Sequence, residues 1–187
     1  MPEPNAAPIP ELVVPVKRLS RRPGASQVSQ IVFEAPKALG SSVIAIPAGQ
    51  AVSVDLLAES VLEGVLATGT ARSAALGECG RCLDEVSQPV EATFQELFVY
   101  PGREAAAGEA SDGDHLTVVD DTIDLTGAVR DAVVLSLPFN PLCREDCEGL
   151  CPECGARLAD WPDHAHRRGD PRWAALEDLL EDERGEI

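Results

Sequence analysis

The sequence is poor in aromatic and basic residues, and it lacks long apolar runs. Aromatic side chains make up 4% of the chain, too few for a platform on which nucleic-acid bases stack. Only 15 residues are Lys or Arg against 32 Asp or Glu, and the net charge of −17 excludes nucleic-acid binding by a generally basic surface. No stretch approaches the roughly 18 apolar residues of a transmembrane helix. The Pro-rich start, Met1 to Pro10, predicts no secretory signal.

Common catalytic and nucleotide-binding motifs are also missing. The sequence has no Gly-rich phosphate loop of the Walker type, no G-x-G-x-x-G after a strand and no His-Glu-x-x-His. No nucleophile is paired with an evident base, and most carboxylates fall in segments typical of solvated surface. We therefore expect a protein that is not an enzyme.

The few basic residues are unevenly placed. Residues 1–50 carry five basic and three acidic residues, a balance of +2, so the other 137 residues carry −19. The one dense basic cluster, next to Pro23-Gly24, consists of Lys17, Arg18, Arg21 and Arg22. Two interpretations stay open: an arm that contacts phosphate, or a solvated loop. Because the rest of the chain is acidic, RNA contact is expected only at a small patch or through a partner protein.

Hydrophobic periodicity predicts an α+β fold with an antiparallel sheet between residues 52 and 100. Val52, Val54 and Leu56 alternate with polar residues as in a half-buried strand. Further strands are expected at residues 61–68 and 90–100, with Gly69 and Gly77 as breaks in the chain.

A change of period predicts a helix that covers this sheet. Leu125, Val129, Val133 and Leu137 recur every four residues, as on the apolar face of a helix over residues 121–137. Asp124 is the expected N-cap of this helix. A second, short helix is expected after Asp170-Pro171, because an N-cap Asp followed by Pro is typical of a helix start.

These patterns divide the chain into four expected parts. They are a disordered tail (1–11), an α+β core domain (12–139) with a flexible loop (101–114), a cysteine- and histidine-containing zinc-binding segment (140–169), and a C-terminal helix with an acidic tail (170–187).

Six cysteines without a secretory signal indicate a reducing cytoplasm, where clustered cysteines are more often metal ligands than disulfides. Four of them form a dense block: Cys143, Cys147, Cys151 and Cys154. Cys-Pro-Glu-Cys-Gly is typical of a zinc turn, because two thiolates on one tight turn can reach a tetrahedral ion about 2.3 Å away. We expect this block to hold about one structural zinc ion that stabilises a segment too short to fold alone.

The ligand set stays open. His164 or His166 could replace one or two of the cysteines, and only one of the two is expected to bind because alternate side chains of an extended chain point apart. Arg144 and Arg157 could offset the charge of four thiolates.

A second pair, Cys79 and Cys82, could complete a metal site with the later block. It could also be two unligated thiols in a turn, or a redox dithiol. The redox interpretation is disfavoured because strand-like sequence follows the pair instead of the helix of a thioredoxin-type motif.

Several segments, considered together in their order along the chain, resemble the YceD family, also called large ribosomal RNA subunit accumulation protein. The segments that carry the resemblance are Val14-Pro15-Val16 to Pro23-Gly24, Glu78–Leu83, Ile123–Leu125 through Leu137-Pro138, Leu142–Cys147 with Gly149–Gly155, and Asp170–Trp173 with Leu176. The cysteine block is similar to that of the family's metal-binding branch. Some members carry Cys-x-Cys where this chain has His164-Ala165-His166, which implies that either histidine can be an alternate ligand.

The resemblance implies a bacterial, cytoplasmic, non-catalytic ribosome-biogenesis factor that acts in accumulation or processing of large-subunit (23S) rRNA. Its expected partners are that rRNA or its precursor particle, with RNA contacts from the basic cluster and from Arg81, which could instead brace its turn. An alternative is an acidic adaptor or chaperone that holds a basic ribosomal protein or an RNA-processing nuclease and never touches RNA.

Overall fold

One long strand organises the fold of the residues described by the computed structural model, which are 8–19, 22–103 and 116–166. This strand, β6 (Gly64–Glu78), pairs along its whole length with β7 (Glu85–Val99), from Gly64 opposite Val99 to Glu78 opposite Glu85. On its other side, β6 pairs with β5 (Ala51–Ser60) near its start and with β4 (Ile44–Ile46) near its end. The outer strands β2 (Ser26–Glu34) and β3 (Leu39–Gly40) complete an antiparallel sheet of six strands.

The sheet differs from the prediction at its glycines and in its additional strands. Gly77 does not break the chain but lies inside β6, where it pairs with Val86 on one side and Ile44 on the other. Gly69 lies inside β6 as well, because the ring of Phe94 on β7 fills the space above it: a Cβ on Gly69 would lie 2.4 Å from Phe94 Cζ. In addition, β2 precedes the predicted strands. Its pattern is weak because this edge strand is exposed at every second residue and fully buried only at Phe33.

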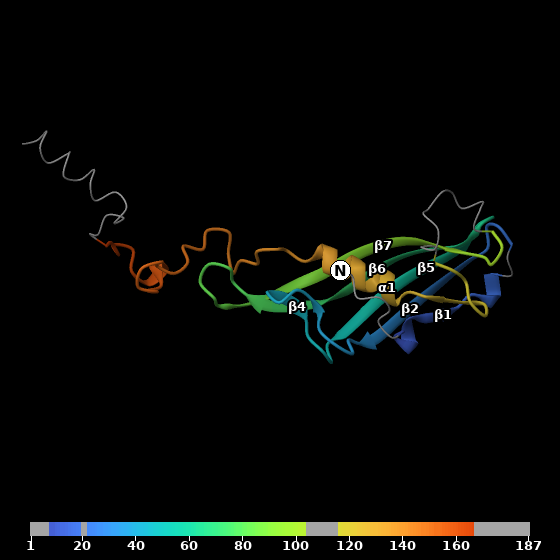
Figure 1. The fold of residues 1–187 in the computed structure, drawn as a ribbon, viewed down its shortest axis with the longest axis horizontal. Coiled ribbons are helices and arrows are strands. Elements are labelled where there is room, and N and C mark those ends of the chain that lie inside the picture. The colour runs from blue at the N-terminus through green and yellow to red at the C-terminus, as the bar shows by residue number, and fades with distance from the viewer. Residues whose placement is uncertain (1–7, 20–21, 104–115, 167–187) are drawn as a thin grey trace, which may run out of the picture.

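One helix, α1 (Thr126–Ser136), packs against β7, β6 and β3 and forms the second layer of an α+β fold (Figure 1). Its buried side chains are those of the predicted stripe, including Val129 and Val133. The N-cap of α1 is Leu125 and not the predicted Asp124, because β8 (Thr122–Asp124) extends to Asp124. The carboxylate of Asp124 still accepts a hydrogen bond from the Thr126 backbone N–H at 2.9 Å. Strand β8 pairs with β1 (Val13–Pro15).

The predicted tail of residues 1–11 overlaps ordered chain at its C-terminal end. Ile9 is buried and donates its backbone N–H to the Thr126 hydroxyl at 2.9 Å. The 3₁₀ helix η1 (Pro10–Leu12) follows, with Leu12 fully buried, and a second 3₁₀ helix, η2, spans Lys17–Leu19. Apolar Ile9 and Leu12 thus complete the core at the start of α1.

Residues 140–166 continue from α1 past the end of the sheet where β6 turns into β7 (Figure 1). This segment contains a short 3₁₀ helix, η4 (Leu158–Asp160). Most of the predicted loop at 101–114 and the predicted helix after Asp170 lie outside the described residues.

Replacing Leu12 with Ala should lower the free energy of unfolding by about 3 kcal/mol, because a fully buried leucine loses its contacts and leaves a cavity. Leu135→Ala is the matched control, since Leu135 is 84% exposed on α1 and its loss should cost less than about 0.5 kcal/mol. Urea unfolding at fixed zinc concentration measures both. Equal effects of the two substitutions would contradict the packing of the N-terminal segment.

Candidate metal centres

The turn between β6 and β7 places two thiols on one side of the hairpin. It is closed by hydrogen bonds from Cys79 N–H to the Asp84 carbonyl at 2.7 Å and from Leu83 N–H to the Cys79 carbonyl at 3.0 Å. The chain that follows α1 passes close to this turn: Gly80 donates to the Pro141 carbonyl at 2.8 Å, and a Cβ on Gly80 would lie 1.9 Å from Asn140 Oδ1. A larger residue at position 80 would therefore have to displace the Asn140 side chain.

This close approach brings four sulfur atoms together, those of Cys79, Cys82, Cys143 and Cys147, which we call the four-thiol group. Cys79 Sγ lies 3.8 Å from Cys147 Sγ, and Cys82 Sγ lies 3.6 Å from Cys143 Sγ. Four sulfurs at about 2.3 Å from a tetrahedral zinc ion are about 3.8 Å apart, whereas bonded sulfurs are about 2.05 Å apart. The spacing fits four ligands of one ion rather than disulfides.

The surroundings of the four-thiol group favour a bound cation. Cys79, Cys82 and Cys147 are buried. Backbone N–H groups, that of Cys82 first and then that of Cys143, lower the pKa of Cys79 to about 6, so this thiol is ionised at neutral pH. For Cys82, the Asp84 backbone N–H acts to lower the pKa, but burial and the neighbouring thiols together raise it to about 12. A metal ion would allow all four sulfurs to be thiolates at once.

A second group, which we call the Cys/His group, lies further along the chain and contains Cys151, Cys154, His164 and His166. Cys154 Sγ is 3.3 Å from His164 Nε2, which is 2.9 Å from His166 Nε2. The Cys-Pro-Glu-Cys-Gly turn is closed by a hydrogen bond from Gly155 N–H to the Cys151 carbonyl at 2.8 Å, and Gly155 has a φ of 71°. The backbone N–H of Cys154 is the main cause that lowers the pKa of Cys151 to about 7.

The structure thus divides the predicted ligand block. Cys143 and Cys147 lie with Cys79 and Cys82, while Cys151 and Cys154 lie with the histidines. His164 and His166 also converge instead of pointing apart, because the chain around Ala165 is not a strand. Two groups could therefore hold a metal ion, where the sequence predicted about one. Of the alternatives for Cys79 and Cys82, the structure supports the one in which they complete a metal site with cysteines of the later block. The sequence did not predict which cysteines join them, because the paired residues are 61 and 68 positions apart.

Arg81 braces the loop that carries two of the ligands. Its guanidinium donates to the Cys147 carbonyl at 2.8 Å and to the Glu145 carbonyl at 3.4 Å. Its own carbonyl accepts the Leu150 N–H at 3.1 Å, and Gly149 packs against it. Of the two predicted roles of Arg81, the structure places the side chain in the position of a brace.

A charged pair connects the Cys/His group to the same hairpin. Arg157 donates to both carboxylate oxygens of Asp84, with Nη1 2.6 Å from Oδ2. The pairing lowers the pKa of Asp84 and raises that of Arg157. Arg157 and Arg144 were both expected to offset thiolate charge. Arg157 pairs with Asp84 and also interacts electrostatically with Cys82. Arg144 pairs with Asp146 at 3.4 Å.

The basic cluster lies at the other end of the sheet. Lys17 and Arg18 are in η2, Arg22 is exposed, and Arg21 is outside the described residues. Gly24 N–H donates to the Ser60 carbonyl, which places this segment near the start of β6, whereas Cys79 follows its end. The intervening 15-residue strand spans roughly 45–50 Å. The basic cluster and the cysteine groups are therefore separate regions.

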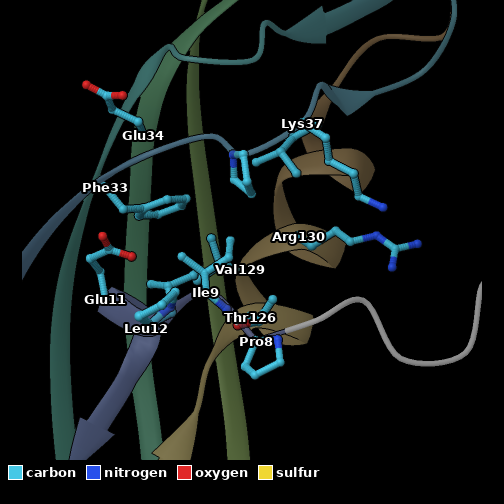
Figure 2. Close-up of a pocket in the computed structure, with 13 residues that line it drawn as sticks. Pro8, Ile9, Glu11, Leu12, Phe33, Glu34, Lys37, Thr126, Val129 and Arg130 are labelled. Atoms are coloured by element: carbon cyan, nitrogen blue, oxygen red, sulfur yellow. Dashed lines mark hydrogen bonds between the residues drawn. The ribbon is translucent and has the colours of Figure 1, made fainter.

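A cavity of about 480 Å³ opens between the N-terminal segment, the end of β2 and α1. Ile9, Phe33 and Val129 form its apolar wall, with Lys37 and Arg130 on one side and Glu11 and Glu34 on the other (Figure 2). The residues that line it include no cysteine, histidine or serine. It is a hollow with a mainly apolar wall and charged side chains on two sides.

Fold and site together define a class: a small α+β protein in which cysteines of a sheet hairpin join cysteines and histidines of the C-terminal part in two groups that could hold a metal ion. Residues 67–180 match the family described as "Large ribosomal RNA subunit accumulation protein YceD", and the chain belongs to this family. The resemblance seen in the sequence is confirmed.

Proteins from several organisms are similar to this chain. Protein Rv2926c of Mycobacterium tuberculosis is 46% identical over 170 residues, which cover 90% of this chain and 81% of that protein. Protein YlbN of Bacillus subtilis is 35% identical over 107 residues (54% and 58% of the two chains). The Zea mays "Large ribosomal RNA subunit accumulation protein YCED homolog 1, chloroplastic" is 27% identical over 106 residues (43% and 36%). No solved structure matches the chain.

Within the described residues, no helix has the length and apolar character needed to span a membrane.

Arg157→Gln and Asp84→Asn should each loosen residues 150–161 from the hairpin, and the double variant should loosen them no further, because both remove one bidentate pair. Hydrogen exchange of the backbone amides measures the effect. Arg72→Gln, which breaks pairs with Asp55 and Glu91 on the sheet, is the control and should leave exchange in this segment unchanged. Additive effects of the first two substitutions would contradict the pairing.

Proposed function

We propose that this protein is a non-catalytic factor, acting in the cytoplasm, that promotes accumulation or processing of large-subunit (23S) rRNA by binding that rRNA or its precursor particle. The observation that carries the proposal is membership in the large ribosomal RNA subunit accumulation family over residues 67–180. The match includes the turn between β6 and β7, α1 and both groups that could hold a metal ion. The proposal therefore applies to the part of the chain that contains the candidate metal centres.

Zinc is the proposed cofactor, and its proposed role is structural. The four-thiol group joins the β6–β7 turn to the chain after α1, so an ion there would hold the C-terminal segment against the sheet. Four thiolates match the preference of zinc in closed sites, which leave no open position for a substrate.

The proposed RNA contact is the basic cluster of Lys17, Arg18, Arg21 and Arg22. Its supporting observation is charge: it lies in residues 1–50, which have a balance of +2, at the end of the sheet away from the cysteines. Arg81 is a weaker candidate, because its guanidinium already donates to two backbone carbonyls.

The alternative function, an acidic adaptor for a basic ribosomal protein or an RNA-processing nuclease, is favoured by the net charge of −17. Crosslinking of the tagged protein in its own cells, followed by sequencing of bound RNA, separates the two. A discrete peak on large-subunit rRNA or its precursor supports direct contact. A co-purifying basic protein without an RNA peak supports the adaptor.

Neutralising the cluster in the variant Lys17→Gln, Arg18→Gln, Arg22→Gln should weaken rRNA binding and flatten its dependence on salt, with a change in log–log slope of up to about 3. Lys37→Gln, Arg72→Gln, Arg130→Gln removes the same charge away from the cluster and is the matched control. Filter binding between about 50 and 200 mM salt measures the slopes. Equal slopes for the two variants would contradict an RNA-binding arm.

A redox role for Cys79 and Cys82 is a third, less favoured function. It requires a disulfide between these residues that forms and breaks in the cell. Thiol trapping of the protein from growing cells should find both thiols reduced and, after metal chelation, open to alkylation. A fraction of disulfide that changes with oxidant would support the redox function instead.

A further inference from the structure

The two groups differ in how they are built. The four-thiol group joins segments 61 to 68 positions apart, and three of its four residues are buried. The Cys/His group takes all its residues from 151–166, and Cys151 is its one buried member. An ion in the first group would be enclosed between the sheet hairpin and the chain after α1, whereas an ion in the second would lie near solvent.

The geometry of the Cys/His group fits the ligands of one metal ion. Two imidazole Nε2 atoms lie 2.9 Å apart and a thiol sulfur lies 3.3 Å from one of them. In a tetrahedral zinc site with Zn–N near 2.0 Å and Zn–S near 2.3 Å, neighbouring ligand atoms are about 3.3–3.8 Å apart. The Cys154–His164 distance is close to this spacing, the two imidazole nitrogens lie somewhat closer together, and all four ligand atoms of the group lie within 4.8 Å of one another. Two nitrogens and two sulfurs gathered in this way are compatible with a Cys₂His₂ zinc site.

The segment that carries the Cys/His group is attached to the rest of the protein by contacts with the β6–β7 turn. The four-thiol group does not depend on that segment in return. Leu150 N–H binds the Arg81 carbonyl, and Arg157 pairs with Asp84, so residues beside the four-thiol ligands hold the second segment in place. Cys143 and Cys147, in contrast, precede this segment and are positioned by the turn and by Arg81. Loss of an ion from the second group would therefore leave the first group intact.

We propose that the chain holds two zinc ions of unequal lability: an enclosed ion in the four-thiol group and an exchangeable ion in the Cys/His group. Both the exposure of the second group and its short span in the chain make opening easy, since its ligands can separate without disturbing the sheet. In addition, a neutral imidazole binds zinc less strongly than a thiolate does. This proposal goes beyond the rRNA function and does not depend on it.

Zinc content of the full-length protein tests the number of ions. Wild type should contain two zinc ions per chain, and the variant His164→Ala, His166→Ala should contain one. His115→Ala, which replaces the third histidine of the chain, is the matched control and should keep two. One ion in the wild type, or two in the double histidine variant, would overturn the proposal.

Release kinetics and cobalt substitution test the difference between the sites. A chromophoric chelator should remove one wild-type ion at least about tenfold faster than the other, and the fast phase should disappear in the double histidine variant. With cobalt in place of zinc, that variant should keep about two-thirds of the thiolate-to-cobalt absorption, since four of six Co–S bonds remain. Release in a single phase, or loss of all thiolate absorption with the sheet still folded by circular dichroism, would refute unequal sites. Both tests use isolated protein, so they can fail or succeed whatever happens to rRNA in cells.

Discussion

The contact between the β6–β7 turn and the chain after α1 is the constraint on which the C-terminal part of this protein depends. The Asn140 side chain lies against Gly80, and a backbone hydrogen bond joins Gly80 N–H to the Pro141 carbonyl. This contact sets the distance between two cysteines of the turn and two that follow the helix. Without it the four sulfur atoms could not lie within ligand distance of one ion.

The rest of the structure leads to this contact. Strand β6 pairs with β7 over 15 residues, which carries the turn far beyond the part of the sheet that α1 and the N-terminal segment cover. The buried stripe of α1 fixes where the helix ends, and Asn140 follows within four residues of Ser136. Among the described residues, the buried apolar cluster at this end is small: it consists of Cys79, Cys82, Val86 and Cys147, with Leu142 packed against it. So little core is a physical reason for a metal ion to stabilise it.

Local pattern was sufficient to predict much of the fold. Alternation revealed β5 and the buried face of β7, and the four-residue period revealed α1, because each of these elements has one face in the core. Elements without that contrast were missed: β2 is an edge strand with exposed valines, and β3 and β4 are too short for a pattern. Gly69 was misread as a break because its requirement comes from Phe94, a cross-strand neighbour 25 positions away.

For the site, the sequence indicated all eight ligand residues but not their grouping. Spacing along the chain favours the nearest cysteines, yet Cys143 and Cys147 face a turn that only the register of β6 and β7 brings to them. X-ray absorption at the zinc edge of the full-length protein tests the account most directly. We predict an average of three sulfur and one nitrogen ligands per zinc, from six sulfurs and two nitrogens shared by two ions. A first shell of four sulfurs with one zinc per chain, or one that contains mainly oxygen, would contradict it.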